Sequence, residues 1–288
     1  MIAFFEWFAH SAWGWAFAAI WGSLWGSFAN VCIFRLPLNL SLVSPASRCP
    51  NCHQTIAWFD NLPLISFACL GGKCRYCRQS ISWQYPIIEL FSVGLVLLTF
   101  WRFVWLEKTS VPIALQFGRL IAYGHFGIIL LVLSAIDLKH FLIPDRVTLP
   151  ATISYFVAAY LLGDIHWADS LIGLLVGYFV LWLVGTVYFY LTRREGLGLG
   201  DAKLLALIGA TLGWRAIPWT ILVASVAGTL VSAPFLCFYR KRTVTTQSKP
   251  QHIPFGPFLA FAALSYLFLF LNKSFDEIIA SVYANLDL

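Results

Sequence analysis

Residues 168–191, ADSLIGLLVGYFVLWLVGTVYFYL, decide the class of protein that this chain forms. Asp169 is the only charged residue among them, and a helix needs about 20 mostly apolar residues to cross the hydrocarbon core of a bilayer. The rest of the chain is similar, because 60% of its 288 residues are hydrophobic and 11% are charged, against about 25% charged residues in a soluble domain. This composition excludes a disordered chain, a disulfide-stapled secreted miniprotein and a conventional soluble enzyme, and it indicates a polytopic membrane protein.

Eight apolar runs predict an all-α polytopic membrane protein with about eight transmembrane helices. The runs cover residues 11–34, 84–106, 113–136, 147–163, 168–191, 201–213, 216–238 and 254–272. The sixth run is short, so we expect it to be tilted or partly buried. The chain is expected to divide into a first transmembrane helix at residues 1–34, a loop domain at residues 35–83 and a multi-helix membrane domain at residues 84–288.

The positions of the basic residues orient the chain in the membrane. Fourteen of the 19 Lys and Arg residues fall in four connections, at residues 35–83, 137–146, 192–203 and 239–253. Because basic loops are retained in the cytoplasm, we expect these connections inside the cell and both termini outside. The net charge of +6 also suits nucleic-acid binding, but short basic clusters between apolar runs favour membrane topology, and no nucleic-acid partner is expected. The N-terminus lacks a basic segment and is not expected to be a cleaved signal peptide.

Small residues in the first apolar run predict close helix packing. Gly22-Ser23 and Gly26-Ser27 are spaced by one helical turn, and Asn30 follows one turn later. In a membrane such residues let two helices approach closely and form hydrogen bonds across their interface. No internal repeat of 20–50 residues is expected.

Two C-x2-C pairs in the first loop predict a zinc site. The first is Cys49-Pro50-Asn51-Cys52, and the second is Cys74-Arg75-Tyr76-Cys77. Four thiolates complete a tetrahedral zinc site and leave no position open for a substrate, so the expected role is structural. Neighbouring cations, Arg75 among them, would offset the negative charge of the Zn(Cys)4 group. Disulfides are the alternative, but the proposed side of the membrane is reducing.

Asp137 and Asp201 are the acidic residues with the strongest indication of chemistry. Asp137 ends the third run in Ser134-Ala135-Ile136-Asp137, and Asp201 begins the sixth in Gly198-Leu199-Gly200-Asp201. Two crossings separate them, so both are expected at the same membrane face. Close carboxylates share a proton, so that one activates water while its protonated partner polarises a carbonyl group. The alternatives are a helix N-cap for Asp201, and an interfacial anchor or a partner of Lys139 for Asp137.

Three further acids have other expected roles. Asp145 follows Ile143-Pro144 and is expected to cap the fourth helix. Glu89 lies inside the second run and needs a polar partner, because a carboxylate is costly in a membrane. Glu195 is expected to pair with Arg193 or Arg194.

Taken in order, these motifs resemble those of the bacterial type IV prepilin peptidases, which are membrane aspartic proteases of the GxGD type. The resemblance runs from Gly26-Ser27-Phe28 through the two cysteine pairs to Pro254-Phe255-Gly256-Pro257. Between these ends it includes Arg35-Leu36-Pro37, Tyr85-Pro86 with Glu89, Ile136-Asp137 with Ile143-Pro144-Asp145, and Glu195 through Lys203-Leu204-Leu205.

The resemblance implies a reaction, a substrate class and two cofactors. Asp137 and Asp201 would be the catalytic pair. The enzyme would remove the basic leader from type IV prepilins and from type II secretion pseudopilins, at the cytoplasmic face of the bacterial inner membrane. It would also methylate the new N-terminal amine, using S-adenosylmethionine. The four cysteines place the chain with the members that have the zinc-bearing loop, and spacing assigns no residues to the methyl donor.

Two other classes of protein are the alternatives. An ion- or proton-coupled transporter would use Asp137, Asp201 and Glu89 as a relay, and a noncatalytic scaffold would bind a partner through its zinc loop. Transport does not explain a glycine-flanked aspartate together with a cysteine loop. For the peptidase, we expect local acids such as Glu195 to receive the cations of the leader.

Overall fold

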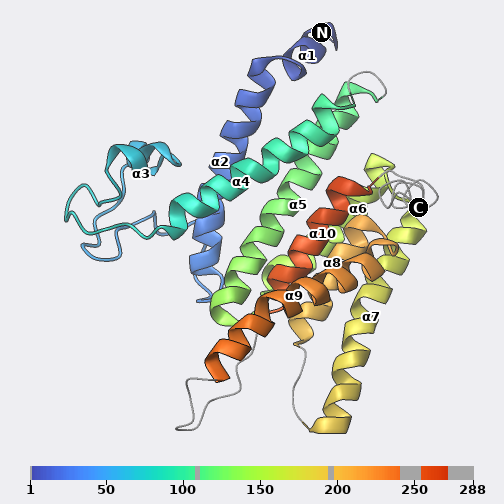
Figure 1. The fold of residues 1–288 in the computed structure, drawn as a ribbon. Helices are drawn as coiled ribbons and strands as arrows, with labels where there is room; N and C mark the ends of the chain where they lie inside the picture. The colour runs from blue at the N-terminus through green and yellow to red at the C-terminus, as the bar shows by residue number, and fades with distance from the viewer. Residues whose placement is uncertain (1, 108–110, 194–197, 241–253, 272–288) are drawn as a thin grey trace. The chain divides into compact units, whose positions relative to one another are not determined.

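The computed structural model describes residues 2–107, 111–193, 198–240 and 254–271. By their internal contacts the residues divide into two compact units, 1–144 and 145–288. The first unit, blue to green in Figure 1, contains α1 (Ile2–Ala9), α2 (Ala12–Arg35), η1 (Trp58–Asn61), α3 (Ile65–Cys69), α4 (Gln84–Phe100), η2 (Trp101–Trp105) and α5 (Ile113–His140). The second unit contains α6 (Asp145–Leu162), α7 (Trp167–Thr192), α8 (Leu199–Leu212), α9 (Ala216–Arg240) and α10 (Gly256–Leu269).

The prediction of an all-α membrane protein is confirmed, since the described residues form helices and loops without a β-strand. A helix occupies each of the eight predicted runs, and α1 precedes them. Within the described residues, five helices are long and apolar enough to cross a membrane, namely α2, α4 with η2, α5, α7 and α9. Helices α8 and α10 have 14 residues each, which corresponds to about 21 Å and is less than the roughly 30 Å of a bilayer core. The count of eight spans is therefore not confirmed.

In the first unit, α2 packs closely on α4 through its glycines. A Cβ atom on Gly26 would lie 2.8 Å from the Cα atom of Glu89, and one on Gly22 would lie 2.9 Å from the Cα atom of Val93. Asn30 then donates from Nδ2 to the carbonyl oxygen of Tyr85 at 3.1 Å. The predicted small-residue packing is confirmed, and it brings the start of α4 against the end of α2.

In the second unit, α8 is the buried central helix. From Leu204 to Leu212 every side chain is buried, and α8 contacts α6, α7, α9 and α10. Gly173 of α7 and Gly209 of α8 lie against each other's backbone, and the Ser170 hydroxyl donates to the carbonyl oxygen of Ala210 at 2.5 Å. A helix that is apolar on all sides is typical of a protein core, and the expectation that the sixth run is partly buried is confirmed.

Candidate functional site

The two cysteine pairs form matching knuckles. In the first, the backbone N–H of His53 donates to the carbonyl oxygen of Cys49 at 3.0 Å; in the second, Arg78 donates to Cys74 at 3.0 Å. Both donors have a positive φ, 57° for His53 and 59° for Arg78. Each knuckle is closed by one antiparallel bridge, Arg48 with Thr55 and Lys73 with Ser80.

This symmetry corresponds to a short repeat that the sequence itself contains. Residues 48–56 are RCPNCHQTI, and residues 73–81 are KCRYCRQSI. The copies lie 25 positions apart, so the expectation of no repeat at 20–50 residues is wrong in this loop. The signal is the pattern of a basic residue, C-x2-C, then glutamine and isoleucine at fixed offsets.

The four sulfur atoms converge as a metal site requires. The Sγ atoms of Cys49, Cys52, Cys74 and Cys77 all lie within 4.8 Å of one another, and those of Cys49 and Cys77 are 3.8 Å apart. Four sulfurs bound tetrahedrally at about 2.3 Å from zinc would be about 3.8 Å apart. The cluster therefore fits a structural metal ion.

Hydrogen bonds around the cluster favour a thiolate at one of its members. The pKa of the Cys77 thiol is lowered to about 6, first by the backbone N–H of Gln79 and next by the side-chain amide of Asn51. Thiolates are the form that binds metals, so these hydrogen bonds favour the metal-binding form at Cys77.

Arg75, between the two cysteines of the second knuckle, forms an ion pair with Asp60. Arg75 donates to both carboxylate oxygens of Asp60, at 2.7 Å from Nε and 2.6 Å from Nη2, and its guanidinium lies 5.4 Å from the ring centroid of Phe59. The expectation that Arg75 serves to offset the charge of the metal cluster therefore needs correction, because its guanidinium is bound bidentately by Asp60. The same contact holds the pKa of Asp60 below its usual value, through the hydrogen bonds and then the charge of Arg75.

The loop is attached to the membrane helices through Glu89. This side chain is 7% exposed, and its Oε2 atom accepts a hydrogen bond from the backbone N–H of Leu64 at 2.8 Å. Leu64 has a φ of 60°, which is uncommon for a residue other than glycine, and α3 begins directly after it. The prediction that Glu89 needs a polar partner is confirmed, and the partner is a backbone amide of the cysteine loop.

Asp137 lies in the last turn of α5. It is 6% exposed, and its carbonyl oxygen accepts from the backbone N–H of Phe141, which ends the helix with a φ of 53°. Lys139, its suggested alternative partner, donates instead to the side-chain oxygen of Gln84.

Asp201 lies in the first turn of α8 and is half-buried. Gly198 occupies the N-cap position and accepts from the backbone N–H of Asp201 at 3.1 Å, so the N-cap alternative for Asp201 is wrong.

Two residues further on, Lys203 donates to both carboxylate oxygens of Asp145, at 2.7 and 2.8 Å. Asp145 is the first residue of α6, its expected capping role stays a prediction, and this ion pair, which the sequence did not predict, joins the first turns of α6 and α8.

The expected site residues are distributed over both units. Asp137 and the four cysteines belong to residues 1–144, and Asp201 belongs to residues 145–288; their pairing stays a prediction. Glu195, the expected acceptor of leader cations, lies outside the described residues.

Two protein families match the chain. The bacterial peptidase A24 N-terminal domain matches residues 20–103, and the type IV leader peptidase family matches residues 125–233. This chain belongs to the type IV leader peptidase family.

Individual relatives agree with this membership. A prepilin leader peptidase/N-methyltransferase of Klebsiella pneumoniae is 41% identical over 221 residues, which are 75% of this chain and 92% of that protein. Proteins with the same name are 34% identical in Pseudomonas putida, over 85% of this chain and 87% of the relative, and 35% identical in Myxococcus xanthus, over 81% and 68%. No solved structure matches the chain.

The chain is an integral membrane enzyme, because it belongs to this peptidase family and the part that the structure describes contains five apolar helices of spanning length. The four cysteines fall within the N-terminal match, and both aspartates fall within the leader peptidase match. The transporter alternative finds no support among these relatives.

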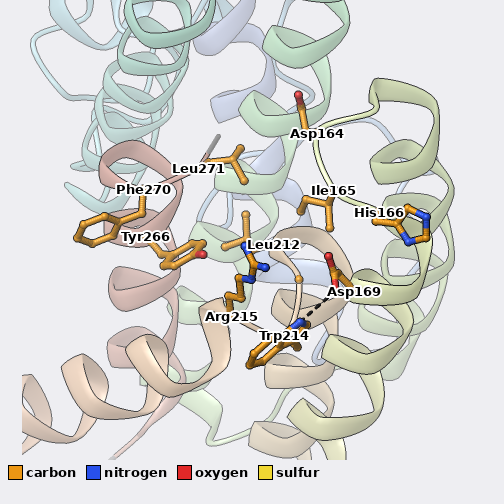
Figure 2. Close-up of a pocket in the computed structure, with 11 residues that line it drawn as sticks. Asp164, Ile165, His166, Asp169, Leu212, Trp214, Arg215, Tyr266, Phe270 and Leu271 are labelled. Atoms are coloured by element: carbon orange, nitrogen blue, oxygen red, sulfur yellow. Dashed lines mark hydrogen bonds between the residues drawn. The ribbon is translucent and has the colours of Figure 1, made fainter. Parts of the chain in front are cut away.

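The described residues assign no site to a methyl donor. Arg215 lines two cavities in the second unit, near the C-terminal end of α8, and Figure 2 shows the one that also contains Asp169. Asp201 lies in the first turn of the same helix and lines neither cavity.

Proposed function

We propose that this chain removes the basic leader peptide from type IV prepilins and type II secretion pseudopilins, and then methylates the new N-terminal amine. The observation that carries the proposal is the pair of family matches, in order along one chain, with Asp137 and Asp201 both inside the leader peptidase match. The names of the relatives, prepilin leader peptidase/N-methyltransferase, support both activities.

Asp137 and Asp201 are the proposed catalytic pair, and their helices suggest how they divide the work. The N-terminus of a helix carries a partial positive charge and its C-terminus a partial negative one. Asp201, in the first turn of α8, is therefore suited to act as the carboxylate that takes a proton from water. Asp137, in the last turn of α5, is suited to carry the shared proton and polarise the scissile carbonyl group.

The cysteine loop is proposed to bind one structural zinc ion at the cytoplasmic face of the bacterial inner membrane. Cys49, Cys52, Cys74 and Cys77 would hold the metal, and zinc would supply folding energy to a loop with little apolar core. The hydrogen bond from the backbone N–H of Leu64 to the side chain of Glu89 then attaches this loop to α4. The partners are the precursor pilins and membrane lipid, and nucleic acid is not among them.

The test uses purified full chain, a prepilin, and mass spectrometry of the prepilin N-terminus. Asp137→Asn and Asp201→Asn should each lower cleavage by about 10²–10⁴-fold, the range of general acid–base catalysis. Glu6→Gln, which removes a carboxylate from α1, is the control and should cleave normally. Cleavage retained at the normal rate by either aspartate variant would reject the catalytic pair.

Methylation is tested separately, because its residues are unassigned. A pilin that already lacks its leader is incubated with S-adenosylmethionine and either the native chain or Asp201→Asn. Methylation of this product by the native chain supports the second activity, and its retention in Asp201→Asn would place the methyl transfer in a site that does not need Asp201. Absence of methylation by the native chain would refute this part of the proposal.

Unchanged binding of a leader peptide by Glu195→Gln would argue against the expected role of Glu195.

A further inference from the structure

A polar cavity of about 130 Å³ lies within the second unit, between the loop before α7 and the ends of α8 and α10. Figure 2 shows its lining, with Asp169 and Trp214 on one side, Tyr266 and Phe270 on the other, and Arg215 between them. The cavity is distinct from the proposed catalytic residues, because Asp201 lies at the opposite end of α8.

Arg215 and Asp169 can each form further hydrogen bonds or ion pairs with a ligand in this cavity. Arg215 is exposed, and its guanidinium lies 5.8 Å from the ring centroid of Trp214. Among the residues that the structure describes, Arg215 forms no ion pair. Asp169 accepts a hydrogen bond on Oδ1 from Nε1 of Trp214 at 3.1 Å, and a carboxylate has further acceptor sites. Arg215 thus lines one cavity with two carboxylates, Asp164 and Asp169, and no ion pair joins Arg215 to Asp169.

An apolar groove of about 510 Å³ adjoins the polar cavity. It shares Trp214, Arg215, Tyr266 and Phe270 with that cavity, and adds Pro218, Trp219 and Leu222 from α9. Trp219 is positioned by a hydrogen bond from Nε1 to the Ser265 hydroxyl at 3.0 Å and by an edge contact with Phe270. Leu222 is 61% exposed, so the groove is open at the surface.

We propose that the second unit binds one phospholipid with a phosphoethanolamine headgroup at this place. The phosphate would bind Arg215, the ammonium group would bind Asp169, and an acyl chain would lie in the groove along Trp219 and Leu222. Charge complementarity selects this occupant, because a zwitterionic headgroup satisfies a cation and an anion that do not pair with each other. Tryptophan beside a charged group is also typical of the membrane–water interface.

The test is a titration of the full chain in detergent with defined lipids, followed by native mass spectrometry. Phosphatidylethanolamine should bind with a stoichiometry of one, more tightly than phosphatidylcholine, whose ammonium donates no hydrogen bond, and than phosphatidylglycerol, which has no ammonium. Arg215→Gln should weaken binding about tenfold or more, as expected for loss of a charge-assisted hydrogen bond. Asp169→Asn should abolish the preference for phosphatidylethanolamine over phosphatidylglycerol.

Matched variants separate the groove from the general lipid surface. Leu222→Ala should weaken binding several-fold, whereas Leu230→Ala, on the same helix, 68% exposed and outside the groove, should leave it unchanged. Thermal unfolding in detergent without lipid should differ little between Arg215→Gln and the native chain, because the exposed Arg215 loses no ion pair among the described residues and only its contact at 5.8 Å with the ring of Trp214.

Three results would overturn the proposal. Equal affinity for the three lipids, unaffected by Arg215→Gln, would show an ordinary lipid annulus. Inorganic phosphate that binds as tightly as the lipid would show an ion site. Lipid binding that appears only after residues 272–288 are removed would assign the groove to that part of the chain. The titration contains no prepilin, so its failure leaves the proposed peptidase function untouched.

Discussion

Gly26→Ala tests whether the close approach of α2 and α4 stabilises the first unit. The added Cβ atom would lie 2.8 Å from the Cα atom of Glu89 and 2.9 Å from the Cβ atom of Ser92, whereas ordinary contact begins at 3.4 Å. The two helices would have to separate by about 0.6 Å, and overpacking of this kind costs about 1–3 kcal/mol. Alanine regains up to about 1 kcal/mol through its higher helix propensity. We therefore expect a net loss of up to about 2 kcal/mol in the free energy of unfolding.

The matched control is Gly94→Ala, in α4. A Cβ atom at Gly94 meets nothing within 4 Å, so only the propensity gain remains and the variant should be neutral or slightly more stable. The assay is reversible unfolding in mixed micelles with an increasing fraction of denaturing detergent, followed by circular dichroism.

Limited proteolysis reports on the cysteine loop in the same two variants. Gly26→Ala should accelerate cleavage within residues 36–83, because Glu89 holds this loop through the backbone N–H of Leu64 and lies at the displaced contact. Equal unfolding free energies for Gly26→Ala and Gly94→Ala would refute the packing argument.

Three further outcomes follow from the cysteine loop and from the start of α8. Cys49→Ser should lose the bound zinc and give a lower folded yield, because metal binding is coupled to folding. Cys69 is exposed and outside the cluster, so Cys69→Ser should keep both the bound zinc and the normal yield. A normal yield without bound zinc in Cys49→Ser would contradict a structural site. Lys203→Met should change the free energy of unfolding by less than about 1 kcal/mol, the usual contribution of an exposed ion pair. The same variant should lower prepilin cleavage at least tenfold, because it releases the first turn of α8 from Asp145. The double variant Lys203→Asp with Asp145→Lys should restore cleavage, and a double variant without rescue would count against this positioning role. Arg75 lowers the pKa of Asp60 in the folded protein. Their ion pair therefore stabilises the loop at pH values above the pKa of Asp60 in the unfolded chain, about 3.9. This stabilisation is lost as the pH falls through the lower pKa of the folded state. Pepsin should therefore cleave the loop of Asp60→Asn faster than that of the native chain near pH 5, with the two rates converging at lower pH, and parallel profiles would reject the contribution.

The sequence alone determined the features that depend on local composition and spacing. An apolar run such as residues 168–191 must leave water and satisfy its own backbone, which only a helix does within one segment. The spacing within each C-x2-C pair likewise brings two sulfurs to one point, so the cysteine site could be inferred before any fold was known. The ordered motifs around Asp137 and Asp201 pointed to the family that the comparisons established.

Only the tertiary structure decided which distant residues are neighbours. Glu89 was expected to need a polar partner, but its bond to Leu64 depends on how the cysteine loop folds back on α4. The ion pair of Lys203 with Asp145 spans 58 positions, and the burial of α8 depends on the glycines through which α7 approaches it. Hydrophobicity is a property of each segment, whereas these contacts depend on the register and separation of packed helices, which no single segment specifies.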